Sequence, residues 1–327
     1  MRLTVALLMS LTAFAADPVI PPDAPQAEIS NGVITAKLLM PDAQKGYYRG
    51  TRFDWSGQIY SLRANNHEYF GQWFQRYDPK INDAIMGPVE EFMPGEKGLG
   101  YDEAKPGEEF IRIGVGAVRK PDEKAYQRFQ TYEITDSGKW TVKTGKDWAE
   151  YTQDLPAHNG YAYRYTKRIS LAKGKPEMTI EHTLKNTGTK KISAQQYNHN
   201  FFVIDDQPTG PDSSVKFPFD LKPQKPVPAD LAEIKGRDVG YLKELQRGQT
   251  VMIEMSDGFS GKASDYDIRV ENKKAGAGVR IQGDQPVTKL VYWSIRPTTC
   301  PEAYVPINVE PGKQSKWTYK YTFYEVK

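Results

Sequence analysis

The sequence has 327 residues, of which 39% are hydrophobic and 26% are charged, a composition typical of a globular protein with a large buried core. Its 44 basic and 41 acidic residues leave a formal net charge of +3, so the charge balance does not favour nucleic acid or an anionic membrane as a partner. A single cysteine, Cys300, excludes an intramolecular disulfide. The four histidines form no HExxH motif or other closely spaced pair, so the sequence predicts no metal site.

The N-terminus is typical of an export signal. Arg2 supplies a positive charge, residues 3–14 are mostly apolar but too short to span a bilayer, and Ala13-Phe14-Ala15 fits the small-x-small cleavage pattern. We therefore expect a secretory signal peptide over residues 1–16 and an exported protein, periplasmic or secreted. A short N-terminal membrane anchor is the alternative. No later segment is apolar enough to cross a membrane.

The region after the signal predicts an extended segment and then strands. Residues 17–27 contain four prolines and are expected to form a Pro-rich lead-in, followed by one folded domain over residues 28–327. Asn31-Gly32 lies between two short apolar runs, which is a strong hairpin signal.

Alternating aromatic and polar residues predict half-buried strands over most of the remaining chain. Clear examples are residues 161–169, 178–184 and 317–323, and residues 110–115 form a further β-rich run. Helical periodicity is scarce, with one candidate at residues 230–234, and the Pro- and Lys-rich residues 217–228 are expected to form a surface loop. Many short strands with regular turns indicate an all-β sandwich or barrel.

Two segments about a hundred residues apart carry the strongest candidates for acid–base chemistry. His199 lies in the segment YNHNFF at residues 197–202, and Glu302 follows Cys300 and Pro301. Histidine exchanges a proton near neutral pH, and a carboxylate among apolar neighbours has a raised pKa, as a general base often needs. The structural alternatives are a partly buried histidine with satisfied hydrogen bonds and a surface glutamate in a loop.

Two further clusters combine aromatic and charged residues in the way sugar sites do. Residues 47–55 contain Arg49, Arg52 and Asp54 among aromatic side chains, which stack on sugar C–H faces while charged groups bind hydroxyls. Glu90 and Glu91 form a carboxylate pair beside the Gly87-Pro88 turn. A surface ion-pair cluster is the alternative for each. A nucleophile system is poorly supported, because no GxSxG elbow occurs.

The order of these segments resembles the galactose mutarotase (aldose 1-epimerase) superfamily. The matching segments are Asn198-His199-Asn200-Phe201-Phe202 near mid-chain, and Cys300-Pro301-Glu302 followed by Pro311-Gly312 and a final aromatic strand. The resemblance implies a large antiparallel β-sandwich with the site in a concave face, a carbohydrate partner and no cofactor.

Carried over to this sequence, the resemblance implies that His199 is the general acid and Glu302 the general base of anomer interconversion by ring opening. Arg49, Arg52, Asp54, Glu90, Glu91, Asn198 and His67 are then candidate sugar contacts. The sequence lacks the family's early Leu-His-Gly-Gly segment, and the neighbours of His67 do not match it. Arg49 and Arg52 replace the family's early Asn-Arg pair only loosely.

Two other functions remain open from the sequence. One is a different carbohydrate-active enzyme on the same scaffold, such as a lyase or an epimerase acting on an acidic or oxidised sugar, which the many Arg and Tyr residues favour. The other is a non-catalytic sugar-binding protein. Fold alone does not decide among the three.

Overall fold

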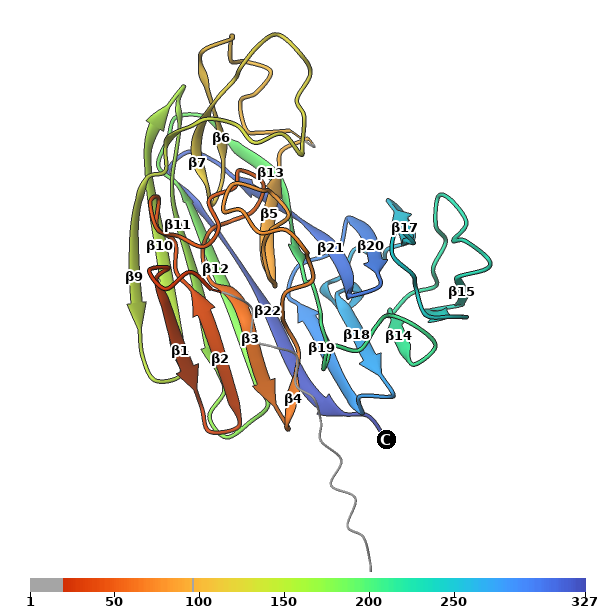
Figure 1. Ribbon diagram of the computed structural model, residues 1–327. Helices are drawn as coiled ribbons and strands as arrows, with labels where there is room; N and C mark the ends of the chain where they lie inside the picture. Colours follow the sequence, from red (N-terminus) through yellow and green to blue (C-terminus); the bar gives the residue numbers. More distant parts are fainter. Residues whose placement is uncertain (1–19, 96) are drawn as a thin grey trace, which may run out of the picture.

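The computed structural model describes residues 20–95 and 97–327, which fold into layered antiparallel β-sheets (Figure 1). Within these residues the only helix is a short 3-10 turn, η1 (Ala263–Asp265). The prediction of an all-β sandwich is confirmed. The predicted signal peptide at residues 1–16 lies outside the described residues. No helix in the described part of the chain is long and apolar enough to cross a membrane.

The largest layer is a ten-stranded antiparallel sheet that runs the length of the molecule (Figure 1). In spatial order its strands are β15 (Ala232–Lys235), β16 (Asp238–Tyr241), β14 (Ser213–Lys216), β18 (Asp267–Asn272), β19 (Ala277–Gly283), β22 (Gln314–Glu325), β12 (Glu177–Asn186), β11 (Tyr161–Leu171), β10 (Trp148–His158) and β9 (Lys139–Thr144).

A five-stranded sheet packs against the middle of this layer. Its order is β17 (Val251–Met255), β20 (Lys289–Ile295), β21 (Thr298–Val309), β13 (Ile192–His199) and β5 (Val89–Met93). The rings of Phe92 on β5 and Trp317 on β22 meet edge to face at 6.0 Å, which joins the two sheets.

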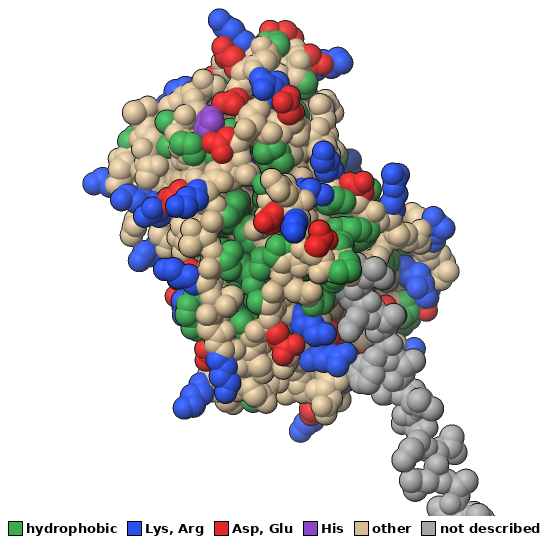
Figure 2. Space-filling view, turned by 60° about the vertical axis from the view of Figure 1, so that its left-hand side comes forward, with side chains coloured by type: hydrophobic (Ala, Val, Ile, Leu, Met, Phe, Trp, Pro, Cys, Tyr) green, Lys and Arg blue, Asp and Glu red, His purple; other side chains and the backbone are tan. Residues whose placement is uncertain are grey.

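Two smaller sheets complete the fold. One contains β1 (Gln26–Ser30), β2 (Ile34–Leu39), β3 (Gln58–Ala64) and β4 (His67–Glu68), and the other contains β6 (Glu109–Arg112), β7 (Gly116–Arg119) and β8 (Ile134–Asp136). Figure 2 shows one face of the molecule, where hydrophobic side chains gather in the middle and charged side chains of both signs surround them.

The alternation of apolar and polar residues in the sequence matches the alternation of buried and more exposed side chains along the long strands. On β12 the buried positions are Met178, Ile180, His182, Leu184 and Asn186, with more exposed residues between them. The last strand, β22, alternates in the same way. The predicted hairpin at Asn31-Gly32 is present, with β1 and β2 on either side and Gly32 at a φ of 89°, a backbone conformation that glycine adopts without strain.

Two local predictions were wrong. Residues 110–115 are not one strand, because Gly114 at a φ of 83° turns the chain and separates β6 from β7. Residues 230–234 are not helical, because Ile234 pairs with Val239 in a hairpin around Gly236 that extends the large sheet. β1 begins at Gln26, so the last two residues of the segment predicted as a lead-in lie in a strand.

Candidate active site

The register of β13 with its neighbours gathers several polar side chains on one face of the five-stranded sheet. Tyr197 on β13 pairs with Glu91 on β5, and the rings of Tyr197 and Tyr304 on β21 stack at 4.4 Å. Because successive side chains on a strand point to opposite faces, His199 and Glu302 lie on this same face. We call this the outer face; the opposite, inner face points toward the ten-stranded sheet.

His199 and Glu302 meet directly, although 103 residues separate them in the sequence. Nε2 of His199 lies 3.3 Å from Oε1 of Glu302, and the side chains are only 6% and 5% exposed. The imidazole stacks on Phe201 at a ring distance of 3.7 Å, and the ring edges of Phe53 and Trp293 each approach it at 5.7 Å. The pair therefore lies in a largely apolar, water-poor environment.

This environment favours the uncharged form of both residues. Burial raises the pKa of Glu302 to about 8, although the nearby Arg52 and Arg128 oppose the change. Burial lowers the pKa of His199 well below its usual value, and the same two arginines lower it further. At neutral pH the pair therefore holds one proton, which resides on the carboxyl group of Glu302.

Beside this pair, Glu91 binds three arginines. Nε of Arg52 donates to Oε2 at 2.9 Å, Nη2 of Arg112 donates to Oε1 at 3.2 Å, and Arg128 donates to both oxygens, at 2.8 and 3.2 Å. Tyr197 also donates to Oε2 and accepts hydrogen bonds from Arg52 and Arg128. Burial would raise the pKa of Glu91, but the three guanidinium groups outweigh it and hold the pKa far below its usual value.

These arginines come from loops and edges far apart in the sequence. Arg52 follows β2, Arg112 ends β6 and Arg128 lies in the loop between β7 and β8. Arg112 also donates to the backbone oxygen of Arg52 at 2.7 Å, so the loops are joined to one another as well as to Glu91. The carboxylate of Glu91 thus organises one wall of the site.

Three comparisons with known proteins were made. No family model and no curated protein sequence matches the chain. Solved structures do match along nearly the whole chain. Slr1438 from Synechocystis sp. PCC 6803 has a TM-score of 0.58 and 13% identity over 96% of this chain and 100% of its own. The GalM/aldose epimerase homologue from C. elegans has a TM-score of 0.57 and 13% identity, covering 93% and 100%. A galactose mutarotase-like protein from Clostridium acetobutylicum has a TM-score of 0.55 and 13% identity, covering 94% and 100%.

The chain has the galactose mutarotase-like fold. The predicted resemblance is thereby confirmed at the level of architecture. At 13% identity the similarity extends to the fold alone, so the function has to be argued from the residues of the site.

Two of the residues predicted as sugar contacts lie on the outer face with the acid–base pair. Arg52 and Glu91 are hydrogen-bonded to each other, and the charges of both shift the pKa of His199. Arg49 does not join them: its Nη1 donates to the backbone oxygen of Gln44 at 2.6 Å. His67, on β4, instead bonds through Nδ1 to Oδ2 of Asp205 at 2.7 Å.

The remaining three predicted contacts lie on the inner face, away from His199. Glu90 and Asn198 are strand neighbours of Glu91 and His199, so the alternation of the strands turns them inward. Nδ2 of Asn198 donates to the hydroxyl of Tyr321 at 3.1 Å. Asp54 accepts a hydrogen bond from Tyr165 at 3.0 Å on the same inner side.

Glu90 and Asp54 form a sealed ionic cluster with Lys167 and His182. Lys167 bonds to Glu90 and lies 4.0 Å from Asp54, and Nε2 of His182 lies 2.9 Å from Oε1 of Glu90. All four side chains are buried. Burial would raise the pKa of Glu90, but Lys167 and His182 lower it; burial and the proximity of Glu90 raise the pKa of Asp54 to about 7. The cluster joins the two sheets from the inner face.

The site also contains residues that the sequence reasoning did not select. Tyr197 and Tyr304 stand two positions from His199 and Glu302, and period-two alternation from either residue would have indicated them. Arg112 and Arg128 had no such signal. Arg128 lies in an irregular polar loop, and only the fold brings it to Glu91.

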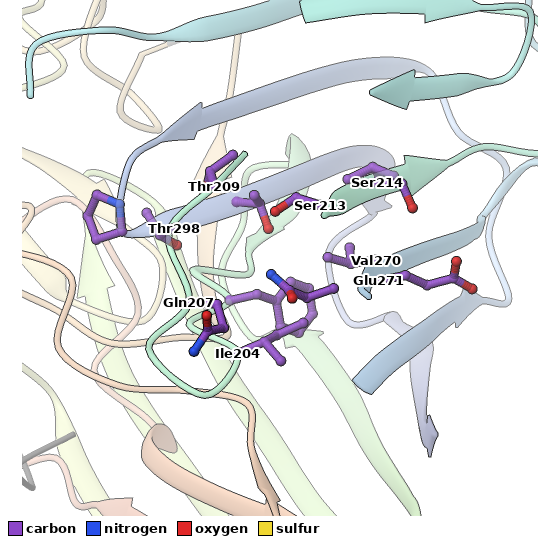
Figure 3. Close-up of a pocket in the computed structure, with 13 residues that line it drawn as sticks. Ile204, Gln207, Thr209, Ser213, Ser214, Val270, Glu271 and Thr298 are labelled. Carbon is purple, nitrogen blue, oxygen red and sulfur yellow. The ribbon is translucent and has the colours of Figure 1, made fainter. Parts of the chain in front are cut away.

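A small pocket lies elsewhere, between β14, β18 and the start of β21 (Figure 3). Gln207, Thr209, Ser213 and Val270 are among the side chains that surround it. Neither His199 nor Glu302 lines this pocket, so it is separate from the acid–base pair. Among the described residues, no group of three or more His, Cys, Asp or Glu is arranged to hold a metal ion.

The ionic cluster on the inner face gives a stability prediction. Lys167→Met removes the cation that lies between Glu90 and Asp54 and leaves two buried carboxyl groups without it. We expect the free energy of unfolding, measured in urea at neutral pH, to fall by about 3–5 kcal/mol. Lys191→Met is the matched control, because Lys191 pairs with Glu310 in solvent, and its loss should cost only about 0–1 kcal/mol. Equal effects of the two substitutions would contradict this account of the cluster.

Proposed function

We propose that the protein is an exported aldose 1-epimerase-like isomerase that interconverts sugar anomers by acid–base ring opening. The observation that carries the proposal is the contact between His199 and Glu302 on the outer face. O1 and O5 of a pyranose are both bonded to C1, so the acid and the base that reach them must lie side by side. The aromatic walls around the pair suit the C–H faces of a sugar.

In the proposed reaction, Glu302 removes the proton from the anomeric hydroxyl while His199 protonates the ring oxygen. The C1–O5 bond breaks as the C1–O1 bond becomes a carbonyl, and rotation about C1–C2 presents its other face. Ring closure then returns the proton from O5 to His199, while the anomeric oxygen regains one from Glu302. Protons and electrons balance, so the reaction needs no co-reactant.

The protonation of the pair matches the needs of this reaction. One donor and one acceptor are required, and at neutral pH the pair holds one proton. The proton resides on Glu302 in the free protein, so a bound sugar must move it to His199 for the roles stated above. Arg52 and Arg128 stabilise the carboxylate that remains but disfavour the imidazolium that forms, so the contacts of the bound sugar have to drive the transfer.

The buried tyrosines of the outer face are better suited to bind the sugar than to act as bases. Burial raises the pKa of Tyr197 well above its usual value and also raises that of Tyr304, so both phenols stay protonated at neutral pH. This favours an isomerase over a lyase that would use one of them as the base.

The apolar N-terminal segment supports export, as part of the same proposal. Mass spectrometry of protein recovered from the host should give a mature N-terminus near residue 17. Detection of the intact chain with Met1 in the cell interior would argue against export.

Substitution of either member of the pair tests the reaction. Glu302→Gln and His199→Asn should each reduce the enzymatic mutarotation rate by about 10²–10⁴-fold, because each removes one proton-transfer group. The rate is measured by polarimetry on freshly dissolved α-anomers, after subtraction of the spontaneous rate.

Glu310→Gln is the control, since Glu310 is an exposed carboxylate just beyond β21. The mutarotation rate of this variant should equal that of the wild type. Wild-type rates in the Glu302 and His199 variants, or no mutarotation of any aldose by the wild type, would refute the proposal. An unsaturated product absorbing in the ultraviolet would point to a lyase instead.

The pH profile of kcat/KM tests the shared proton. The active form holds one proton, so activity should fall about tenfold per pH unit above about 8, where Glu302 loses its proton. Below 8 the profile should stay flat through neutral pH, because the pKa of His199 lies well below 6.5.

The same pH profile is expected if Glu302 is the acid and His199 the base. In either case the active form of the pair holds one proton. Arg128→Gln should move the fall to higher pH, because Arg128 lowers the pKa of Glu302. A profile with an acid limb near pH 4–5 and no fall above 8 would mean that Glu302 has an ordinary pKa.

A further inference from the structure

We propose that the sugar carries an anionic substituent, a carboxylate or a phosphate, and that Arg128 and Phe129 at the rim of the site recognise it. This inference rests on the proposed function for the position of the sugar ring. It extends that function by naming the chemical class of the substrate.

The first argument is the charge of the site. Three arginines converge on Glu91, and within the described residues the only other carboxylate bonded to them is Asp83, which pairs with Arg52. Three guanidinium groups therefore face two carboxylates. The remaining carboxyl group of the site, Glu302, holds its proton at neutral pH. One positive charge is left over among these groups, and an anionic ligand would balance it.

The second argument is which arginine a ligand can reach. The side chains of Arg52 and Arg112 are 7% and 2% exposed, whereas that of Arg128 is 27% exposed. The hydrogen bonds of Arg128 to Glu91 and Tyr197 use Nε and Nη2. A further side-chain hydrogen bond links Arg128 to Tyr304. Arg128 is thus fixed in place and is the most exposed of the three arginines, which suits it to anion recognition.

The third argument is the neighbouring residue. Phe129 is 64% exposed, one of few large hydrophobic side chains so exposed in the described chain. Its ring centroid lies 4.9 Å from the guanidinium carbon of Arg52 and 5.6 Å from that of Arg128. Nδ2 of Asn82 donates a hydrogen bond to the backbone oxygen of Phe129 at 3.0 Å. An anchored, exposed ring beside two arginines can stack on a sugar face while a guanidinium binds the charged group.

The spacing of the site fits a substituent on the same ring. Arg128 bonds to Tyr197, which is two residues from His199 on β13 and therefore about 7 Å along the strand. In a pyranose whose ring oxygen faces His199, C5 bears C6 next to that oxygen. A carboxylate at C6, or a phosphate on O6, is therefore the substituent closest to the ring oxygen that Arg128 could bind.

The experiment compares glucose, glucuronate and glucose 6-phosphate as ligands and substrates. Binding is measured by calorimetry, and anomer exchange by NMR of the anomeric protons. We expect at least tenfold lower Kd and KM for one or both anionic sugars than for glucose. Preference for glucuronate alone would identify a carboxylate as the recognised group. Preference for glucose 6-phosphate alone would identify a phosphate, and preference for both would indicate a site that binds either anion.

Two variants and a matched control assign the residues. Arg128→Gln should raise Kd and KM for the anionic sugar at least tenfold more than it raises those for glucose. Phe129→Ala should weaken binding of both classes. Arg119→Gln is the control, because Arg119 is an exposed arginine at the end of β7 that pairs with Glu133, and its substitution should leave the preference unchanged.

Salt provides a test that needs no variant. For wild-type protein, Kd for the anionic sugar should rise between 50 and 500 mM NaCl, while that for glucose stays constant. Equal affinity for glucose and both anionic sugars, or a preference that survives Arg128→Gln, overturns the inference. Binding of an anionic sugar through Arg128 without anomer exchange would refute the proposed isomerase and leave the inference standing. Anomer exchange of neutral sugars without a preference for anionic sugars would support the proposed isomerase and refute this inference.

Discussion

The alternation of side chains along β5 and β13 is the constraint on which the rest of the site depends. Glu90 and Glu91 are adjacent in the sequence, yet one points into the sandwich and the other to the outer face. The first pairs with the Lys167 cation, is hydrogen-bonded to His182 and joins the two sheets. The second collects three arginines from distant loops. A shift of the register by one residue would exchange the two carboxylates and destroy both clusters.

The arginine cluster in turn controls the acid–base pair. Arg52 and Arg128 lower the pKa of both His199 and Glu302, and burial moves the two values in opposite directions. Burial dominates for Glu302, whose pKa rises, and adds to the effect of the arginines for His199, whose pKa falls. The outcome is a pair that holds one proton over a broad pH range. Glu91 is indispensable to this arrangement, because without it three guanidinium groups would face one another across the site.

Much of this could be predicted from the sequence, and the exceptions have physical causes. The strands were evident because half-buried strands impose a period of two. His199 and Glu302 could be identified because their segments resemble a known family. Asp54, Glu90 and Asn198 were assigned to the site because residue type and local sequence were considered without the side of the strand. Once 89–93 is assigned as a strand next to β13, Glu90 and Glu91 cannot lie on the same face.

Arg128 could not have been found in this way. Its loop has no periodicity, and its role depends on contacts with Glu91 and Tyr197, residues 37 and 69 positions away. Such long-range contacts exist only after the sheets have assembled, so a single sequence contains no local signal for them.

The arginines also bear on the second histidine that the resemblance led us to expect. Besides His199, the described structure contains His67, His158 and His182; these bond to Asp205, to Glu109 and Asp136, and to Glu90. None of the three contacts Glu302. What stands beside the acid–base pair is a pair of arginines, Arg52 and Arg128. A neutral imidazole can exchange a proton, whereas a guanidinium remains charged at any pH the protein meets. In the proposed reaction, His199 and Glu302 exchange protons beside a permanent positive charge, which would favour negatively charged ligands and intermediates in a way that a second histidine would not.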